Sequence, residues 1–329
     1  MPFATICASH TPLLHDGVAS PATRQRVRDA FDAMARHITA FGPELIVQFS
    51  PDHFNGFFYG LMPAFCVGTQ ATSVGDWDTR PGALPVAAER ALELSAQLLA
   101  DGVDVAVSRR MAVDHGFVQI WEEMFDQEQS YPAPVVPIFV NAAAPPLPTY
   151  KRARLLGAAV GRWAAGIGLR TLFAASGGLS HDPPLPDLQT APDPVREALI
   201  AGLPPTVEGM ERRKRAVLAA GEKASRGEPP CQPLNPAWDQ AMIDRFVARD
   251  IGWFDTLDPD VVRRDAGRGA NEMLAWVAAL AAQEAAADTT VSLDFYEAID
   301  GWIAGMAMMS AGLVPEKGTL PAATSLARE

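Results

Sequence analysis

The sequence has few cysteines and no excess of positive charge. Its three cysteines, Cys7, Cys66 and Cys231, are odd in number and widely spaced. This spacing excludes a disulfide framework and a CxxC metal site, so reduced thiols are the simplest interpretation. Lysine and arginine number 27 against 39 aspartates and glutamates, which gives a formal net charge of −12. An acidic surface offers no counter-charge to nucleic acid or to an anionic membrane, and neither is expected as a partner.

Long hydrophobic runs and a targeting segment are also missing. The N-terminus, MPFATICASH, lacks a basic region followed by an apolar core, and no run of about 18 uncharged apolar residues occurs later. We therefore expect a cytoplasmic protein that is not bound to membranes.

Several well-known site motifs are absent: GxGxxG, GxxxxGK[ST], GxSxG and HExxH. The Gly-rich string SGG at 176–178 follows an apolar run, but Pro183 and Pro184 stand where a phosphate-binding helix would begin. Ser180 lies beside His181 without the setting of a nucleophilic serine. A phosphate-binding loop and a serine hydrolase are both disfavoured.

Composition and pattern favour an α/β fold. The chain has 329 residues, 48% of them hydrophobic and 20% charged, which is enough to form a full core. Strand-like runs alternate with helical stretches at 21–41, 85–100 and 150–165. We predict one domain over 1–329 with a central, mostly parallel or mixed sheet and helices on both faces. Its sheet-forming part is expected at about 1–182.

The second part of the chain, about 183–329, is predicted to be mainly helical. Helical stretches are expected at about 206–225, 236–249, 259–264 and 270–286, and strand signals nearly vanish. The string GWIAGMAMMSAGL near the end would expose an apolar face if it were helical, which favours a homo-oligomer, although a buried core helix explains it equally well.

Four of the six histidines lie in short strings rich in Gly, Ser, Asp and Pro, and most of these strings adjoin an apolar run. They are CASHTP at His10, SPDHFNGFF at His53, AVDHGF at His115 and SGGLSHDPP at His181. A single histidine is more often structural than catalytic, but this repeated setting indicates one shared polar site at the ends of strands. His15 and His37 do not share the setting.

Two imidazoles and one carboxylate form the facial triad that holds non-haem Fe(II) and leaves positions open for substrate and O2. Because HExxH is absent, any such triad in this chain must be assembled from distant segments. Spacing alone does not identify its members.

Seven strings resemble the class III extradiol catechol dioxygenases and occur in the same order as in that family. They are CASHTPLL, SPDHFNGFFYGLMPAFCVG, LPV, MAVDHGF, VVPIFVNAAAPPLP, SGGLSHDPP and LNPAWD. The resemblance extends from Ala4 to about Ser310. The resemblance implies extradiol ring cleavage of a catechol by O2 in aromatic catabolism, with Fe(II) as the cofactor.

The family holds its iron with two histidines and a glutamate, and the two histidines match His10 and His53. The glutamate matches Glu272, in GANEMLAW at the start of a helical stretch. An ordinary glutamate in the first turn of a helix would look the same. Asp239 and Glu122 are therefore alternative carboxylates.

The family's two proton-transfer histidines match the other two strings. By resemblance, His181 accepts a proton from the catechol hydroxyl and His115 donates one later, although the sequence equally allows the reverse. Asp52 and Asp114 each precede a candidate histidine and are expected either to orient it or to cap a turn.

The expected substrate is a 3-substituted catechol, 2,3-dihydroxyphenylpropionate or its cinnamate analogue. Within the apolar string 54–65, Asn55 and Phe57 are candidates for the substrate pocket, with core packing as the alternative for most of the string. A carboxylate on the substrate requires a cation, and Arg80, Arg109 and Arg110 are available without a feature that selects one.

Three alternatives remain open at this point. The chain can be a dioxygenase for another substituted catechol, a Zn-type hydrolase or other metal enzyme of the same fold that does not use O2, or a purely structural protein. Iron content and oxygen consumption distinguish the dioxygenases from the other two.

Overall fold

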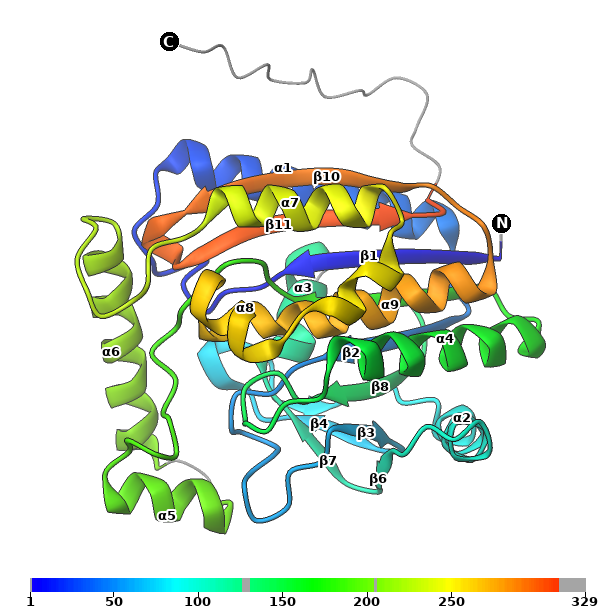
Figure 1. Cartoon of the computed structure of the whole chain (residues 1–329), viewed down its shortest axis with the longest axis horizontal. Coiled ribbons are helices and arrows are strands. Elements are labelled where there is room, and N and C mark those ends of the chain that lie inside the picture. Colours follow the sequence, from blue (N-terminus) through cyan, green and yellow to red (C-terminus); the bar gives the residue numbers. More distant parts are fainter. Residues whose placement is uncertain (1, 126–130, 204–205, 314–329) are drawn as a thin grey trace.

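The computed structural model of the chain describes residues 2–125, 131–203 and 206–313 (Figure 1). Its main sheet has eight strands in the order β10-β11-β1-β9-β2-β8-β3-β6, and a second sheet has three in the order β5-β4-β7. The strands are β1 (Phe3–Ser9), β2 (Leu45–Ser50), β3 (Phe65–Gly68), β4 (Ala71–Ser73), β5 (Gly82–Ala83), β6 (Ala106–Ser108), β7 (Met111–Val113), β8 (Val135–Val140), β9 (Thr171–Gly177), β10 (Val291–Ile299) and β11 (Ala304–Ala311).

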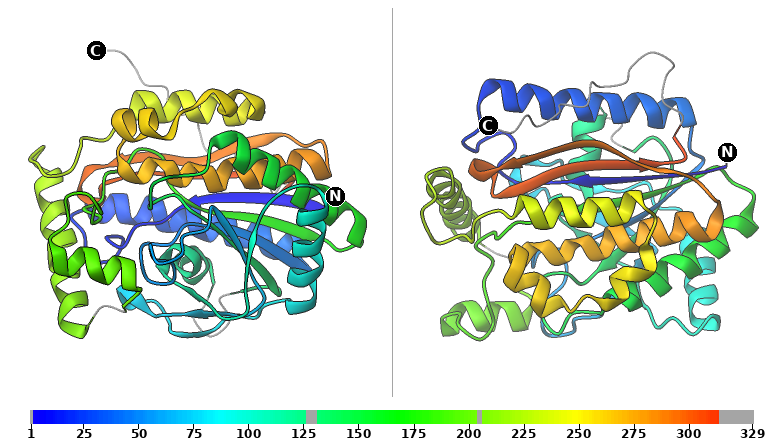
Figure 2. Two further views of the ribbon diagram at one scale, coloured as in Figure 1. Left: turned by 60° about the horizontal axis from the view of Figure 1, so that its bottom comes forward. Right: turned by 45° about the horizontal axis from the view of Figure 1, so that its top comes forward.

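Helices pack on both faces of the main sheet. They are α1 (Pro21–Phe41), α2 (Ala88–Ala100), α3 (His115–Met124), α4 (Tyr150–Ile167), α5 (Asp193–Ala201), α6 (Val207–Ala224), α7 (Pro236–Val247), α8 (Pro259–Ala266) and α9 (Met273–Ala286). Because side chains alternate along a strand, Cys7 packs in the core formed with α4 and α9, whereas its neighbour Ile6 packs in the core formed with α1 and α3. Figure 2 shows α1 on the side of the sheet opposite to α9.

The structure confirms the predicted α/β fold with a mixed, mostly parallel sheet and a helical C-terminal part. The helix expected at 21–41 has these same bounds, because Ser20 caps its first turn and Gly42 ends it in the left-handed region at φ 61°. Helices α5 to α9 occupy the region expected to be helical.

The prediction for the end of the chain is wrong. The string GWIAGMAMMSAGL contains strand β11, which lies between β10 and β1 inside the sheet. All of its residues from Ala304 to Ala311 are buried, because this strand has helices on both sides as well as a strand at each edge. A continuous apolar run without alternation is typical of such a strand and does not distinguish it from a buried helix. The reason for expecting a homo-oligomer from this string is therefore removed.

The topology brings three of the histidine strings to one edge of the sheet. Strands β1, β9 and β2 are parallel neighbours in that order. Their carboxyl ends therefore meet at the same edge, where His10 directly follows β1 and His53 and His181 follow β2 and β9 within a few residues. Among the described residues, no helix combines the length and apolarity needed to cross a bilayer.

Helix α4 packs against α9 with the backbones in close approach. A Cβ built on Gly157 would lie 2.0 Å from the carbonyl oxygen of Ala278, and one on Gly161 would lie 2.1 Å from that of Ala282. Both distances are far below van der Waals contact. Glycine is therefore required where the two helices cross, and α9 is held at a fixed depth on the sheet.

Gly161→Ala is expected to lower the free energy of unfolding by about 1–3 kcal/mol, because the added methyl group pushes the two helices apart. The matched control is Gly166→Ala, since a Cβ at Gly166 in the same helix meets nothing within 4 Å. This control is expected to raise the free energy of unfolding by about 0.5–1 kcal/mol, because alanine loses less conformational entropy than glycine. Urea unfolding of both variants measures the difference, and equal stabilities would contradict the packing argument.

Candidate active site

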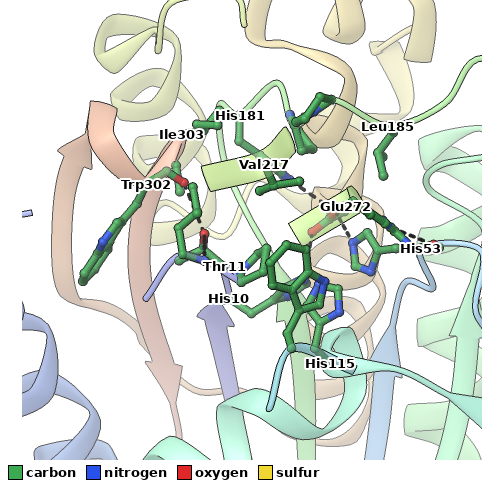
Figure 3. A pocket seen from close by; sticks show the side chains of 17 residues that line it. His10, Thr11, His53, His115, His181, Leu185, Val217, Glu272, Trp302 and Ile303 are labelled. Atoms are coloured by element: carbon green, nitrogen blue, oxygen red, sulfur yellow. Dashed lines mark hydrogen bonds and ion pairs between the residues drawn. The ribbon is translucent and has the colours of Figure 1, made fainter. Parts of the chain in front are cut away.

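A pocket opens at the carboxyl edge of β1, β9 and β2, and all four predicted site histidines line it together with Glu272 (Figure 3). The other walls come from the turn after β1, the turn at Asp76–Asp78 between β4 and β5, the segment after His181, helix α6 and the hairpin between β10 and β11. The lining residues on these walls are Thr11, Pro12, Leu13, Trp77, Pro183, Pro184, Leu185, Arg213, Val217, Trp302, Ile303 and Ala304.

His10 is positioned by the strand that precedes it. Its backbone N–H donates to the carbonyl of Gly177, which continues the pairing of β1 with β9. Its Nδ1 lies 2.9 Å from Oγ of Ser176, on β9, so the hydroxyl fixes the ring orientation. Burial lowers the pKa of His10 to about 3. The ring is therefore neutral at physiological pH, as a metal ligand must be.

His53 is held by a buried carboxylate. Oδ2 of Asp114 accepts from the backbone N–H of His53 at 2.8 Å and lies 3.1 Å from its Nδ1. Burial alone would lower the pKa of His53, but the carboxylates of Asp114 and Glu272 hold it well above its ordinary value. The interaction at Nδ1 leaves Nε2 directed at Glu272.

His115 begins helix α3, with Asp114 as the N-cap whose side chain accepts from Gly116 N. The Nδ1 of His115 lies 2.6 Å from Oδ2 of Asp76, and the other oxygen of Asp76 accepts from the His115 backbone N–H. Carboxylates thus hold both His53 and His115 through Nδ1. The rings of these two histidines stack with centroids 4.5 Å apart.

A backbone carbonyl holds the ring of His181, whereas carboxylates hold the rings of His53 and His115. Its Nδ1 donates to the carbonyl oxygen of Leu179 at 2.9 Å. The segment around it is fixed from two sides, because Asp239 accepts from both the N–H and the hydroxyl of Ser180, and Asp182 pairs with Arg268. The carboxylates of Asp239 and Asp182 therefore position this loop.

Glu272 lies where these histidines converge. Its Oε1 is 3.1 Å from Nε2 of His53 and 3.2 Å from Nε2 of His181, and its Oε2 is 3.7 Å from Nε2 of His10. Burial alone would raise the pKa of Glu272, but the facing rings of His181 and His10 hold it well below its ordinary value. The carboxylate is ionised and almost fully buried.

This donor set fits a divalent cation. A neutral histidine whose Nδ1–H donates to an oxygen carries a lone pair at Nε2. In His53 and His181 this lone pair would point at an oxygen of Glu272, which is also a hydrogen-bond acceptor. A positive charge, either a proton or a metal ion, must stabilise such a contact. Moreover, Oε2 of Glu272 is buried and has no hydrogen-bond partner among the described residues. Imidazole and carboxylate donors suit a first-row transition metal.

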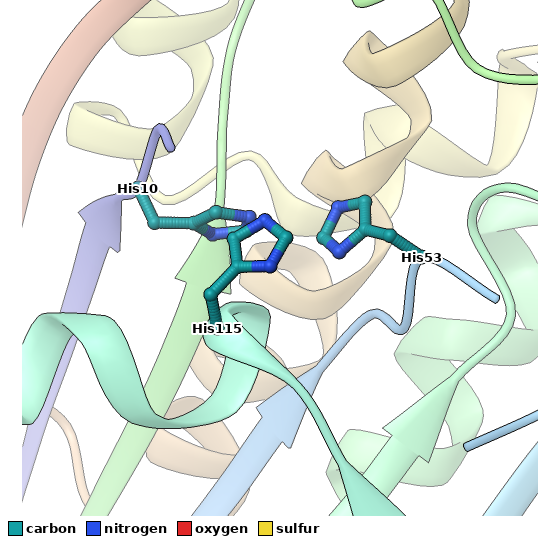
Figure 4. A group of neighbouring side chains, drawn as sticks. All are labelled: His10, His53 and His115. Atoms are coloured by element: carbon teal, nitrogen blue, oxygen red, sulfur yellow. The ribbon is translucent and has the colours of Figure 1, made fainter. Parts of the chain in front are cut away.

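The nitrogen atoms of His10, His53 and His115 also form a compact group, in which the ligand atoms all lie within 4.8 Å of one another (Figure 4). Two ligand sets are therefore geometrically available. One is His10, His53 and Glu272, as the sequence predicts, and the other replaces Glu272 with His115. An ionised carboxylate with an unpartnered oxygen favours the first set.

The two predicted substrate-pocket residues do not line this pocket. The side-chain amide of Asn55 donates to Asp114 at 2.9 Å, so it supports the carboxylate behind His53. The ring of Phe57 stacks on Phe139 with centroids 3.7 Å apart and belongs to the core. Core packing, the alternative noted for this string, therefore accounts for Phe57.

The alternative carboxylates also lie elsewhere. Asp239 holds Ser180 and Tyr296, and Glu122 accepts from the backbone N–H of Arg80. Asp52 accepts three backbone N–H groups of the loop after His53, so it caps a turn, whereas Asp114 orients His53 and not His115, the histidine that it precedes. Among the three carboxylates considered from the sequence, Glu272 is the one that reaches the pocket.

Several residues at the site were not predicted. Ser176 and Asp76 orient His10 and His115 but lie far from them in sequence, so no local motif links the pairs. Trp77 and Arg213 line the pocket, and Arg213 comes from the charged run ERRKR, which has the pattern of a solvated helix face. The predicted arginines, Arg80, Arg109 and Arg110, are exposed and do not line the pocket.

Asp114→Asn is expected to weaken divalent-metal binding by about 10- to 100-fold, because a neutral amide holds His53 less firmly and makes its Nε2 less basic. Anaerobic metal titration measures the dissociation constant. Asp104→Asn is the control, since the Asp104 side chain is 90% exposed. An unchanged dissociation constant in Asp114→Asn would exclude this orienting role.

The chain resembles known proteins along almost its whole length. Residues 4–307 match the family described as the catalytic LigB subunit of aromatic ring-opening dioxygenase. Proteins named 2,3-dihydroxyphenylpropionate/2,3-dihydroxicinnamic acid 1,2-dioxygenase are similar to it. The one from Photorhabdus laumondii is 45% identical over 95% of this chain and 98% of its own length. The one from Paraburkholderia phymatum is 43% identical over 94% of this chain and 98% of its own length. The one from Rhodococcus sp is 42% identical over 96% of this chain and 100% of its own length. The chain therefore belongs to the LigB family of aromatic ring-opening dioxygenases.

Proposed function

We propose that this protein is a non-haem Fe(II)-dependent extradiol dioxygenase that opens the ring of 2,3-dihydroxyphenylpropionate or 2,3-dihydroxycinnamate with O2. The observation that carries the proposal is the convergence of four histidines and one ionised glutamate in a single pocket. The chain's membership of a ring-opening dioxygenase family and the names of its relatives support the substrate class.

In this proposal His10, His53 and Glu272 would hold the iron, a donor set of two histidines and one carboxylate that is typical of non-haem Fe(II) enzymes. The chemistry that such an ion supplies is the transfer of electron density from a catecholate ring to O2. The protein contributes the positions of the reactants and the protons. Ser176 and Asp114 orient His10 and His53 from outside the triad.

His181 is the proposed proton acceptor. Because its Nδ1 donates to the Leu179 carbonyl, its Nε2 carries a lone pair and faces the pocket. A catechol hydroxyl that enters beside Glu272 can transfer its proton to this atom. Burial lowers the pKa of His181, but the Glu272 carboxylate more than offsets this and raises it, which favours proton uptake.

His115 is the proposed proton donor. The carboxylate of Asp76, 2.6 Å from Nδ1, fixes the orientation of the ring, so that Nε2 can be directed into the pocket. The side chains of Trp77, Val217 and Ile303 line the same pocket as the two histidines and limit the access of water. A proton can thus be delivered to the reacting ring by one defined group.

The test is O2 uptake by anaerobically prepared protein loaded with Fe(II) and mixed with 2,3-dihydroxyphenylpropionate, with absorbance recorded for a yellow ring-opened product. Stoichiometric uptake together with colour is the expected result. Bound iron without O2 uptake on this and several other catechols would contradict the proposal and favour a metal enzyme that does not use oxygen.

A further inference from the structure

Helix α6 forms one wall of the pocket and contributes a positively charged side chain to it. Arg213 and Val217, four residues apart on the helix, both line the pocket. This spacing places them on the same helix face. In Figure 1, α6 stands at the end of the main sheet where β1 ends. Arg213 therefore belongs to a different wall of the pocket from the strands that precede the histidines.

The guanidinium of Arg213 has unused donors. Its Nη2 donates to the carbonyl oxygen of His53 at 3.0 Å, and in the described part of the chain it forms no ion pair. A guanidinium has five N–H donors and keeps its charge at all physiological pH values. The residue is half-buried among apolar walls, where an unpaired charge is unfavourable. An anionic group in the pocket would satisfy it.

The other ionisable groups that line the pocket are already engaged. The four histidines contact Ser176, Asp114, Asp76 and the Leu179 carbonyl through Nδ1, and Glu272 faces three of their rings. The permanent positive charge available to a ligand in this pocket is therefore that of Arg213.

Neighbouring contacts hold α6 in place. Nζ of Lys214 lies 2.7 Å from a carboxylate oxygen of Asp78 and 3.1 Å from one of Asp16. Asp78 adjoins Trp77, which lines the pocket, and Asp16 belongs to the turn after β1. Arg213 is thus presented from a helix that is tied to two other walls of the same site.

We propose that Arg213 binds the side-chain carboxylate of the substrate and thereby selects catechols that carry an acidic chain at position 3. This inference rests on the proposed function. The contact with the His53 carbonyl places the guanidinium beside the backbone of a proposed metal ligand, and Arg213 and Glu272 line the same pocket. A planar guanidinium pairs well with a carboxylate through two parallel hydrogen bonds.

The experiment compares two substrates that differ only at the end of the side chain, which is a carboxylate in 2,3-dihydroxyphenylpropionate and a methyl group in 3-propylcatechol. Arg213→Gln is expected to lower kcat/KM for the carboxylate substrate by about 10- to 100-fold, the loss of one charge-assisted pair. The value for 3-propylcatechol is expected to stay within about twofold. Arg212→Gln is the matched control, because Arg212 lies on the exposed side of the same helix and pairs with Glu208.

Binding of 3-phenylpropionate, measured by calorimetry, gives a second readout that does not depend on turnover. Arg213→Gln is expected to weaken this binding at least about 10-fold, and Arg213→Lys by less, because it keeps the charge. Equal losses with both catechols, or unchanged binding of 3-phenylpropionate, would overturn the proposal and make Arg213 a positioning residue for His53. If the wild-type protein cleaves neither catechol, the proposed function fails, and calorimetry alone decides whether Arg213 binds a carboxylate.

Discussion

His53→Ala is expected to abolish metal retention and to reduce ring cleavage to background. His53 lies at the centre of the site, held by Asp114 on one side and facing Glu272 on the other. Removing it deletes one of the three proposed ligands and leaves Glu272 with less compensation for its buried charge. The metal dissociation constant should rise by more than about 100-fold, beyond the effect of an outer-sphere partner. Metal content after gel filtration and anaerobic titration measure this.

The control for His53→Ala is the same substitution at an exposed histidine. The His15 side chain is 61% exposed and pairs with Glu123, away from the pocket. His15→Ala should keep full metal content and activity. Wild-type metal content in His53→Ala would show that the metal binds elsewhere.

His115→Ala is expected to keep the metal and to lower the rate of ring cleavage by about 10²- to 10⁴-fold, the usual contribution of a positioned acid or base. This variant also decides between the two ligand sets, because His115 belongs to the three-histidine group. The paired variant is Glu272→Ala, which is expected to lose the metal as well as the activity.

Metal content and single-turnover rates with 2,3-dihydroxyphenylpropionate are the measurements for this pair. If His115→Ala loses the metal and Glu272→Ala retains it, the triad consists of three histidines and His115 is not the proton donor. A small rescue of His115→Ala by added imidazole would support its role in proton transfer, since a free base can enter the space left by the ring.

The candidate site was largely predictable because its ligands lie in strings that end strands. Strand ends carry polar residues into loops, and parallel strands bring such loops to one edge. His10, His53 and His181 follow this rule at β1, β2 and β9. His115 follows β7 of the smaller sheet and begins helix α3, so its string shares the setting of the other three but reaches the site from a different sheet.

The partners that orient these histidines were not predictable in the same way. Asp76 reaches His115 across 39 positions, and Ser176 reaches His10 across 166. A single aspartate or serine in a loop has many possible partners, and only the three-dimensional fold selects one. Arg213 illustrates the same limit, because a charged run on a helix looks solvent-exposed until a neighbouring wall is placed against it.

Periodicity, capping residues and long motif strings are local features, and they are sufficient for the α/β class, most helix bounds and the four histidines, with three carboxylates left as candidates. The packing of distant segments makes GWIAGMAMMSAGL a buried strand, brings Glu272 to the pocket and leaves Asn55 and Phe57 outside it. It also places the guanidinium of Arg213 at the pocket. The physical reason is that burial, pairing and orientation depend on which distant segments pack together, and a run of residues does not specify its neighbours.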